Sequence, residues 1–141
     1  MSVERTFSII KPDAVAAGHT GEILADIEAA GFKILALRMT RLSEPQARGF
    51  YAVHAAKPFY AGLVKFMTEG PIIVMALERE DAIAKLREAM GATNPANAAE
   101  GTIRKRYAES IERNCIHGSD APDTAQVELA YFFNTLDLAG N

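Results

Sequence analysis

The sequence has one cysteine, Cys115, among its 141 residues, so no disulfide can form within the chain. A single unpaired thiol fits a reducing compartment, because proteins of oxidising compartments commonly rely on disulfides. No second cysteine is present to complete a zinc site with Cys115. We therefore interpret Cys115 as a small, semi-buried apolar residue rather than as a metal ligand.

Long apolar segments are also absent. No stretch approaches the roughly 20 consecutive apolar residues that a membrane-spanning helix requires. Residues 1–5 lack the apolar run of a signal peptide. These absences lead us to expect a cytoplasmic protein without a membrane partner.

Positive charge is not in excess either. The chain has 15 Lys and Arg residues against 18 Asp and Glu residues, a net charge of −3. Sequence-independent binding to nucleic acid depends on many Lys and Arg contacts to phosphates. We therefore expect no specific nucleic-acid partner, although a local basic patch is compatible with this total. The composition, 49% apolar and 23% charged, and the length fit one globular domain over residues 1–141.

Several common nucleotide-binding motifs are missing. The sequence has no G-x-x-x-x-G-K-[ST] loop, no H-R-D triplet and no G-x-G-x-x-G segment. Any phosphoryl transfer by this chain must therefore use another device.

Hydrophobic periodicity and turn signals predict three strands, over residues 3–10, 32–42 and 71–77. They predict helices over residues 20–30, 43–55, 59–70, 80–91, 102–110 and 123–133, with a partly extended segment over 114–120. Pro12 ends the first strand, which places Lys11 at the carboxyl end of a buried strand. The order of elements predicts an α+β fold, a ferredoxin-like split βαβ domain with a small antiparallel sheet covered by helices.

The segment 114–120, with the sequence N-C-I-H-G-S-D, concentrates reactive groups. Histidine titrates near neutrality, so His117 can serve as nucleophile, base or ligand. Gly118 lets the backbone approach a ligand closely, and we expect it to leave space for a phosphate. The alternative is a turn whose polar side chains satisfy local backbone groups.

A catalytic histidine needs a group that holds its ring. Glu128 lies between Val127 and Leu129 in the last predicted helix, and a carboxylate in apolar company must be paired to stay charged. We expect Glu128 to contact His117 or Ser119. The alternative is an exposed surface glutamate.

Three cations lie at or just beyond the ends of predicted elements, next to a Gly or Pro: Lys11, Arg87 and Arg104. Thr93 lies in a loop of small residues, where a hydroxyl and backbone N–H groups can hold an anion. Such a set suits phosphate binding. The alternatives are a solvated lysine, an arginine that complements a helix end, and an ordinary loop threonine.

Apolar side chains at helical spacing leave a further choice open. Phe59 and Leu63 follow this spacing, and Tyr51 lies in the preceding helical segment. The pattern is typical of a core. A slot for a nucleobase would look the same, because it needs an aromatic face and an aliphatic wall.

Four segments, taken together, closely resemble those of nucleoside diphosphate kinases, and the resemblance extends over essentially the whole sequence. The segments are Lys11-Pro12-Asp13-Ala14, Gly91-Ala92-Thr93-Asn94-Pro95, Gly101-Thr102-Ile103-Arg104 and Asn114-x-x-His117-Gly118-Ser119-Asp120. One segment alone would be weak evidence. Several at matching spacing are highly specific.

The resemblance implies transfer of the terminal phosphate from a nucleoside triphosphate to a nucleoside diphosphate by a ping-pong mechanism, with His117 as the nucleophile that takes the phosphate on Nδ1. It implies that Glu128 and Ser119 hold the other ring nitrogen and that Tyr51 supports the histidine. The implied substrate contacts are Lys11 and Asn114 for the ribose, with Lys11 also reaching the phosphates; Arg87, Thr93 and Arg104 for the phosphates; and Phe59, Leu63 and Ile111 for the base. The implied cofactor is Mg²⁺ bound through the nucleotide phosphates, without protein ligands.

Members of this family are built from dimers, which implies a homo-oligomer, with a tetramer favoured over a dimer or a hexamer. Glu100, the Lys105-Arg106 pair and the tail over 134–141 depart from the family pattern but remove no site residue. Two rival functions are a nucleic-acid-binding module with aromatics on its strands and a catalytically silent scaffold of the same fold. The net charge and the helical placement of Phe59 disfavour the first, and the presence of every expected site residue disfavours the second.

Overall fold

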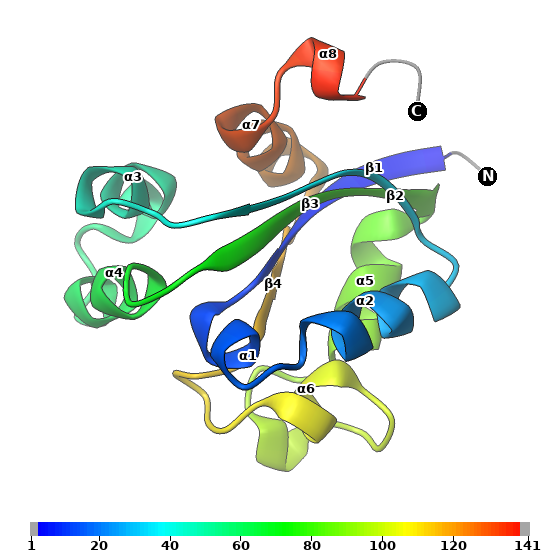
Figure 1. Cartoon of the computed structure of the whole chain (residues 1–141), viewed down its shortest axis with the longest axis horizontal. Helices are drawn as coiled ribbons and strands as arrows, with labels where there is room; N and C mark the ends of the chain where they lie inside the picture. Colours follow the sequence, from blue (N-terminus) through cyan, green and yellow to red (C-terminus); the bar gives the residue numbers. More distant parts are fainter. Residues whose placement is uncertain (1–2, 139–141) are drawn as a thin grey trace.

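The computed structural model describes residues 3–138 and shows an antiparallel sheet of four strands with helices on both faces (Figure 1). The strands are β1 (Val3–Ile10), β2 (Lys33–Thr40), β3 (Ile72–Glu80) and β4 (Ile116–Gly118), in the spatial order β2-β3-β1-β4. The helices are α1 (Pro12–Ala16), α2 (Thr20–Ala29), α3 (Glu44–Phe50), α4 (Tyr60–Met67), α5 (Ala82–Met90), α6 (Ile103–Tyr107), α7 (Pro122–Phe132) and α8 (Thr135–Leu138), with 3₁₀ turns η1 (Ala52–His54) and η2 (Pro95–Asn97). Within this described part, no helix has the length and apolar character that crossing a membrane requires. The strand order confirms the predicted α+β, ferredoxin-like split βαβ fold.

The sheet separates two apolar cores, because alternate residues of a strand point to opposite faces. One core contains Phe7 and Ile9 of β1 together with residues of α3, α4 and α7. The other contains Ile10 of β1 together with residues of α2, α5 and α6. Because helices cover both faces of β1, both sets of its side chains are buried, which explains the continuous apolar run at its end.

The short strand β4 fixes the place of His117. It pairs with the end of β1, where His117 lies opposite Ile9, and Ser8 Oγ donates a 2.7 Å hydrogen bond to the His117 carbonyl. Residues directly opposite in an antiparallel pair share a face, so the His117 side chain lies on the face covered by α3, α4 and α7. The backbone N–H of Lys11 donates to the carbonyl of Cys115 at 2.9 Å, which joins the end of β1 to the start of β4.

Two short helices are missing from the sequence-based prediction. α1 begins at Pro12, because a proline that ends a strand also suits the first position of a helix. α8 lies in the segment 134–141 that departs from the family pattern. Residues 139–141 of that segment lie outside the described residues.

Several predicted boundaries are wrong by about three residues or more, among them the ends of the helices predicted over 59–70 and 102–110, which lie at Met67 and Tyr107. The helix predicted over 43–55 ends at Phe50, and the chain continues as η1. The strand predicted to end at residue 77 extends to Glu80, and the next helix begins correspondingly later. The extension is polar, yet it still pairs with β1, and Arg5 Nε donates to Glu78 Oε2 at 3.1 Å. Pairing with a neighbouring strand can thus prolong a strand beyond its apolar pattern.

Candidate active site

The imidazole of His117 packs against two aromatic rings. Its centroid is 6.0 Å from that of Phe7 and 5.7 Å from that of Phe50, both in edge-on arrangements. The His117 side chain is 19% exposed, so a ligand can reach part of the ring. β1 provides Phe7 and α3 provides Phe50, and the sheet and one helix together therefore limit the orientation of the ring.

Glu128 of α7 holds one nitrogen of this ring. Its Oε1 lies 2.8 Å from Nε2 of His117 and accepts a 2.7 Å hydrogen bond from Ser119 Oγ. A carboxylate only accepts hydrogen bonds, so Nε2 carries the hydrogen, and in the neutral ring Nδ1 has the free lone pair. The predicted contact of Glu128 is confirmed for both His117 and Ser119. Since the Glu128 side chain is only 19% exposed, the alternative of a surface glutamate is excluded.

Tyr51 lies at the end of α3, close to Glu128. Its ring is 4.9 Å from that of Phe50 and nearly perpendicular to it, at 88°. The residue is buried, and its hydroxyl has no hydrogen-bond partner among the described residues. Burial, followed by the negative charge of Glu128, raises the pKa of the Tyr51 phenol. A buried hydroxyl without a partner costs free energy, so this group is a donor that a ligand could satisfy.

Lys11 and Asn114 form a buried polar pair at the end of β1. Lys11 Nζ donates to Asn114 Oδ1 at 2.8 Å, and Asn114 Nδ2 donates to the carbonyl of Ile111 at 2.9 Å. Lys11 is 7% exposed, which excludes the alternative of a solvated surface lysine. Burial, followed by the positive charge of Arg104, lowers the pKa of Lys11 to about 8. An ammonium has three donors, so it can also bind an anion.

Arg104 of α6 is held by backbone carbonyls around the site. Its Nε and Nη2 donate to the carbonyls of Asn114 and Ile116, at 3.3 and 2.8 Å. Its Nη1 donates to the carbonyl of Gly91 at 3.1 Å. Burial lowers the pKa of Arg104. A guanidinium has five N–H donors, so after these three bonds two donors remain for a ligand.

We expected Gly118 to leave space for a phosphate, but the structure gives another reason for a glycine at this position. A Cβ at this position would lie 2.6 Å from Met90 Sδ and 3.0 Å from Leu86 Cδ2. The absence of a side chain therefore lets β4 pack closely on α5. The same two elements are joined by Arg87, whose Nη1 donates to the Gly118 carbonyl at 3.2 Å.

The remaining predicted site residues differ in how far they are buried. Leu63 packs against the core that contains Phe7, whereas Phe59 and Ile111 are 52% and 50% exposed. Thr93 is exposed in the loop between α5 and η2. The interpretation of Phe59 as a core residue is therefore excluded. The interpretation of Leu63 as part of the core is supported.

Two polar residues near His117 have no role in the sequence-based prediction. Burial, followed by the positive charge of Lys57, lowers the pKa of His54. Asp120 acts in the opposite direction and raises this pKa, whereas His117 lowers it further. The Nδ1 of His54 is buried without a partner among the described residues, and its ring is 5.4 Å from that of Phe59. Asp120 accepts a 2.7 Å hydrogen bond from Thr124 Oγ1 at the start of α7, which lowers the pKa of Asp120. Asp120 belongs to the segment 114–120, but no role was predicted for it, and His54 belongs to no motif or periodic pattern of the sequence.

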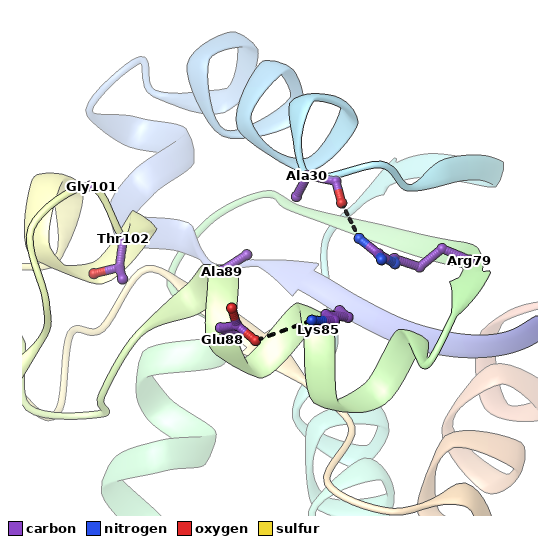
Figure 2. Close-up of a pocket in the computed structure, with 7 residues that line it drawn as sticks. All are labelled: Ala30, Arg79, Lys85, Glu88, Ala89, Gly101 and Thr102. Carbon is purple, nitrogen blue, oxygen red and sulfur yellow. Dashed lines mark hydrogen bonds and ion pairs between the residues drawn. The ribbon is translucent and has the colours of Figure 1, made fainter. Parts of the chain in front are cut away.

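A separate hollow of about 340 Å³ lies beside α5 (Figure 2). It contains none of the predicted site residues and is lined by Ala30, Arg79, Lys85, Glu88, Ala89, Gly101 and Thr102. Its basic side chains turn towards protein groups: Arg79 donates to the Ala30 carbonyl, and Lys85 Nζ lies 3.7 Å from the Glu88 carboxylate. The hollow is therefore not part of the candidate active site.

Comparisons with known proteins point to one family. The family model for nucleoside diphosphate kinase matches residues 4–138. The nucleoside diphosphate kinase of Nitratidesulfovibrio vulgaris (strain DP4) is 59% identical over 138 residues, which cover 98% of this chain and 99% of that protein. The crystal structure of the Aquifex aeolicus nucleoside diphosphate kinase has a TM-score of 0.96 at 41% identity, covering 98% of this chain and 100% of that one. A halophilic nucleoside diphosphate kinase from Halobacterium salinarum, solved in complex with CDP, has a TM-score of 0.94 at 41% identity, covering 99% and 93%.

Proposed function

The chain belongs to the nucleoside diphosphate kinase family, and we propose that it transfers the terminal phosphate of a nucleoside triphosphate to a nucleoside diphosphate by a ping-pong mechanism through a phosphohistidine at His117. One observation carries this proposal. Glu128 Oε1 lies 2.8 Å from Nε2 of His117, so Nδ1 of the neutral ring has a free lone pair. A neutral imidazole is a good nucleophile near neutral pH and needs no separate base.

The reaction has two matching steps. In the first, Nδ1 of His117 bonds to the terminal phosphorus while the bond from that phosphorus to the bridging oxygen breaks, and the oxygen leaves with the electron pair on the nucleoside diphosphate. In the second, a terminal phosphate oxygen of another nucleoside diphosphate attacks the same phosphorus, and the electron pair of the N–P bond returns to Nδ1. The ring gains positive charge when Nδ1 bonds to phosphorus, and the carboxylate of Glu128 stabilises that charge.

We assign the phosphates to Arg87, Thr93 and Arg104, and the ribose hydroxyls to Lys11 and Asn114, with Lys11 also reaching the phosphates. A phosphoryl-transfer transition state spreads charge over its oxygens, so fixed cations supply much of the stabilisation. The buried ammonium of Lys11, 2.8 Å from Asn114 Oδ1, supports this assignment. The unused donors of the Arg104 guanidinium support it as well.

The base is assigned to Phe59, Leu63 and Ile111. Large apolar side chains that stay about half exposed, such as Phe59 and Ile111, are suited to cover an apolar face of a ligand. The Halobacterium salinarum relative was solved in complex with CDP, which supports a nucleotide as the ligand. Stacking without hydrogen bonds to base edges would give weak selectivity among bases.

We propose Mg²⁺ as the cofactor, bound through the nucleotide phosphates. Within residues 3–138, no group of three or more His, Cys, Asp or Glu side chains is arranged to hold a metal ion. Magnesium commonly keeps several waters and binds substrate phosphates rather than a protein cage. The cationic side chains of the site bind phosphates rather than a metal ion, so they fit an ion that arrives with the nucleotide. When bound, the ion would neutralise phosphate charge, and Lys11, Arg87 and Arg104 would orient the phosphates.

The proposal also includes one domain over residues 1–141, a cytoplasmic location and a homo-oligomer built from dimers, with a tetramer favoured. β2 is an edge strand within the described residues, and its Leu37 and Met39 are 44% and 56% exposed. An edge strand with exposed apolar side chains can pair with another chain, which supports association. The unpaired, buried thiol of Cys115 supports a reducing compartment.

The proposal is tested by incubating the protein with ATP that is radiolabelled on its terminal phosphate. We expect an acid-labile, alkali-stable label on the protein, which a nucleoside diphosphate then removes as labelled triphosphate. The chain has three histidines, so His117→Ala should abolish the label, whereas His19→Ala and His54→Ala should keep it. An unlabelled wild-type protein would refute the proposed function, and full labelling of His117→Ala would refute the nucleophile.

A further inference from the structure

The backbone makes an unusual turn directly before β4. Cys115 has φ = 65°, in the left-handed region that residues other than glycine rarely adopt. The N–H of Ile116 donates to the carbonyl of Asn114 at 2.8 Å, so the bond closes a three-residue turn of the γ type around Cys115. A γ-turn with positive φ is rare and strained. Other interactions must therefore hold Cys115 in this conformation.

Asp13 makes such an interaction from α1. Its Oδ2 accepts a 3.1 Å hydrogen bond from the backbone N–H of Cys115, while the Lys11 N–H donates to the Cys115 carbonyl at 2.9 Å. Both backbone groups of the strained residue are thus bound by the segment 11–13. The two segments are 102 positions apart in sequence, so this contact is a tertiary one.

The turn separates two groups of the proposed active site. Asn114 lies on one side of Cys115 and meets Lys11, and His117 lies two residues beyond Cys115, in β4. A turn that relaxed to negative φ would change the direction of the chain at this point. The Asn114 side chain and the start of β4, which carries His117, would then move relative to each other.

Burial of the Asp13 carboxylate is not explained by an ion pair. Asp13 is 4% exposed, and among the described residues no Lys, Arg or His nitrogen lies within salt-bridge distance of it. Its Oδ1 has no hydrogen-bond partner there, and the groups that stabilise the carboxylate include the backbone N–H of Ala14 and that of Cys115. A carboxyl group buried without a paired cation costs free energy.

We propose that Asp13 is a positioning residue for phosphoryl transfer: it holds Cys115 in the left-handed conformation and thereby sets Asn114 and His117 relative to each other. This inference rests on the proposed function. In this role Asp13 acts through the backbone of Cys115 rather than by contact with the substrate.

The test uses the rate constant for phosphorylation of the protein by saturating ATP. We expect Asp13→Ala to lower it about 10-fold, since strain of this kind is large enough for such a change. Asp13→Asn keeps an oxygen acceptor, and its rate should stay within about 3-fold of the wild type. Glycine adopts positive φ without steric cost, so Cys115→Gly should restore Asp13→Ala to within about 3-fold of Cys115→Gly alone.

Asp81 offers a matched control, because it is the other non-glycine residue with positive φ in residues 3–138, at 53°. Asp81 precedes α5 and is not part of the turn at Cys115. Asp81→Gly should therefore not restore the phosphorylation rate of Asp13→Ala. The proposal is overturned if Asp13→Ala reacts at the wild-type rate, if Asp13→Asn is as slow as Asp13→Ala, or if Cys115→Gly gives no specific rescue. If Asp13→Ala alone does not fold, Cys115→Gly must restore both fold and rate, and failure to do so overturns the proposal too. A wild-type protein that takes no phosphate would instead refute the proposed function.

Discussion

Replacing Glu128 by alanine tests how much the hydrogen bond to His117 contributes to phosphoryl transfer. The substitution removes the acceptor 2.8 Å from Nε2 and leaves the ring free to change tautomer. Only the part of the interaction that strengthens in the transition state affects the rate. Two unit charges about 4 Å apart interact by about 4 kcal/mol at an effective dielectric constant of about 20. This figure is an upper bound, because the Glu128 side chain is 19% exposed.

A net loss of about 2–3 kcal/mol corresponds to phosphorylation about 30- to 150-fold slower. The rate is measured by rapid quenching after mixing with radiolabelled ATP, at a temperature where circular dichroism shows every variant folded. Nucleotide affinity should change little, because Glu128 contacts His117 and Ser119 rather than the proposed ligand positions.

Glu128→Gln is the matched control, since it keeps the shape and one oxygen acceptor but loses the charge. We expect it to react about 10-fold slower than the wild type, between the wild type and alanine variants. The reasoning is refuted if Glu128→Ala is phosphorylated at the wild-type rate. Loss of nucleotide affinity with an unchanged rate constant would also refute it, because Glu128 would then act on binding.

Two further predictions concern charge and packing. Lys11 is charged below its pKa of about 8 and neutral above it; kcat/KM should therefore fall as the pH rises from about 7 to about 9, and Lys11→Arg should remove this decline. A pH profile that is the same for both proteins would contradict the assignment of Lys11. Gly118→Ala should lower the free energy of unfolding by about 1–3 kcal/mol in urea denaturation, since its Cβ would lie 2.6 Å from Met90 Sδ. Gly21→Ala, in the open on α2, should cost nothing, and equal losses for both variants would refute this packing argument.

The contacts that the sequence could predict are those with a local or motif-based signal. Glu128 is 11 residues from His117, and its apolar neighbours show that it needs a partner. The order of strands and helices was sufficient for the fold, because the continuous apolar runs in β1 and β3 indicate strands that are buried on both faces. Proline gives a less complete signal: Pro12 ends a strand and also begins α1.

Contacts that depend on two distant segments have no such signal. The reason for Gly118 lies in Met90 and Leu86 of α5, so it appears only when β4 is packed on that helix. The strained turn at Cys115 makes its hydrogen bond to Asp13, which is 102 positions away. A cysteine gives no indication of positive φ, since glycine and asparagine are the residues that usually adopt it.

The two buried cations of the site indicate why a polyanion would bind there. Lys11 and Arg104 are 7% and 6% exposed, and in the part of the chain that is described neither forms an ion pair with a carboxylate. Burial, followed by repulsion from the positive charge of Arg104, lowers the pKa of Lys11. Buried, unpaired charge costs free energy, and phosphate groups would pair with both cations and offset their repulsion. Arg104 also holds the carbonyls of Asn114 and Ile116 on either side of Cys115. The cation assigned to the phosphates thus also fixes the turn that precedes His117, so phosphate binding and the position of the nucleophile depend on the same side chain.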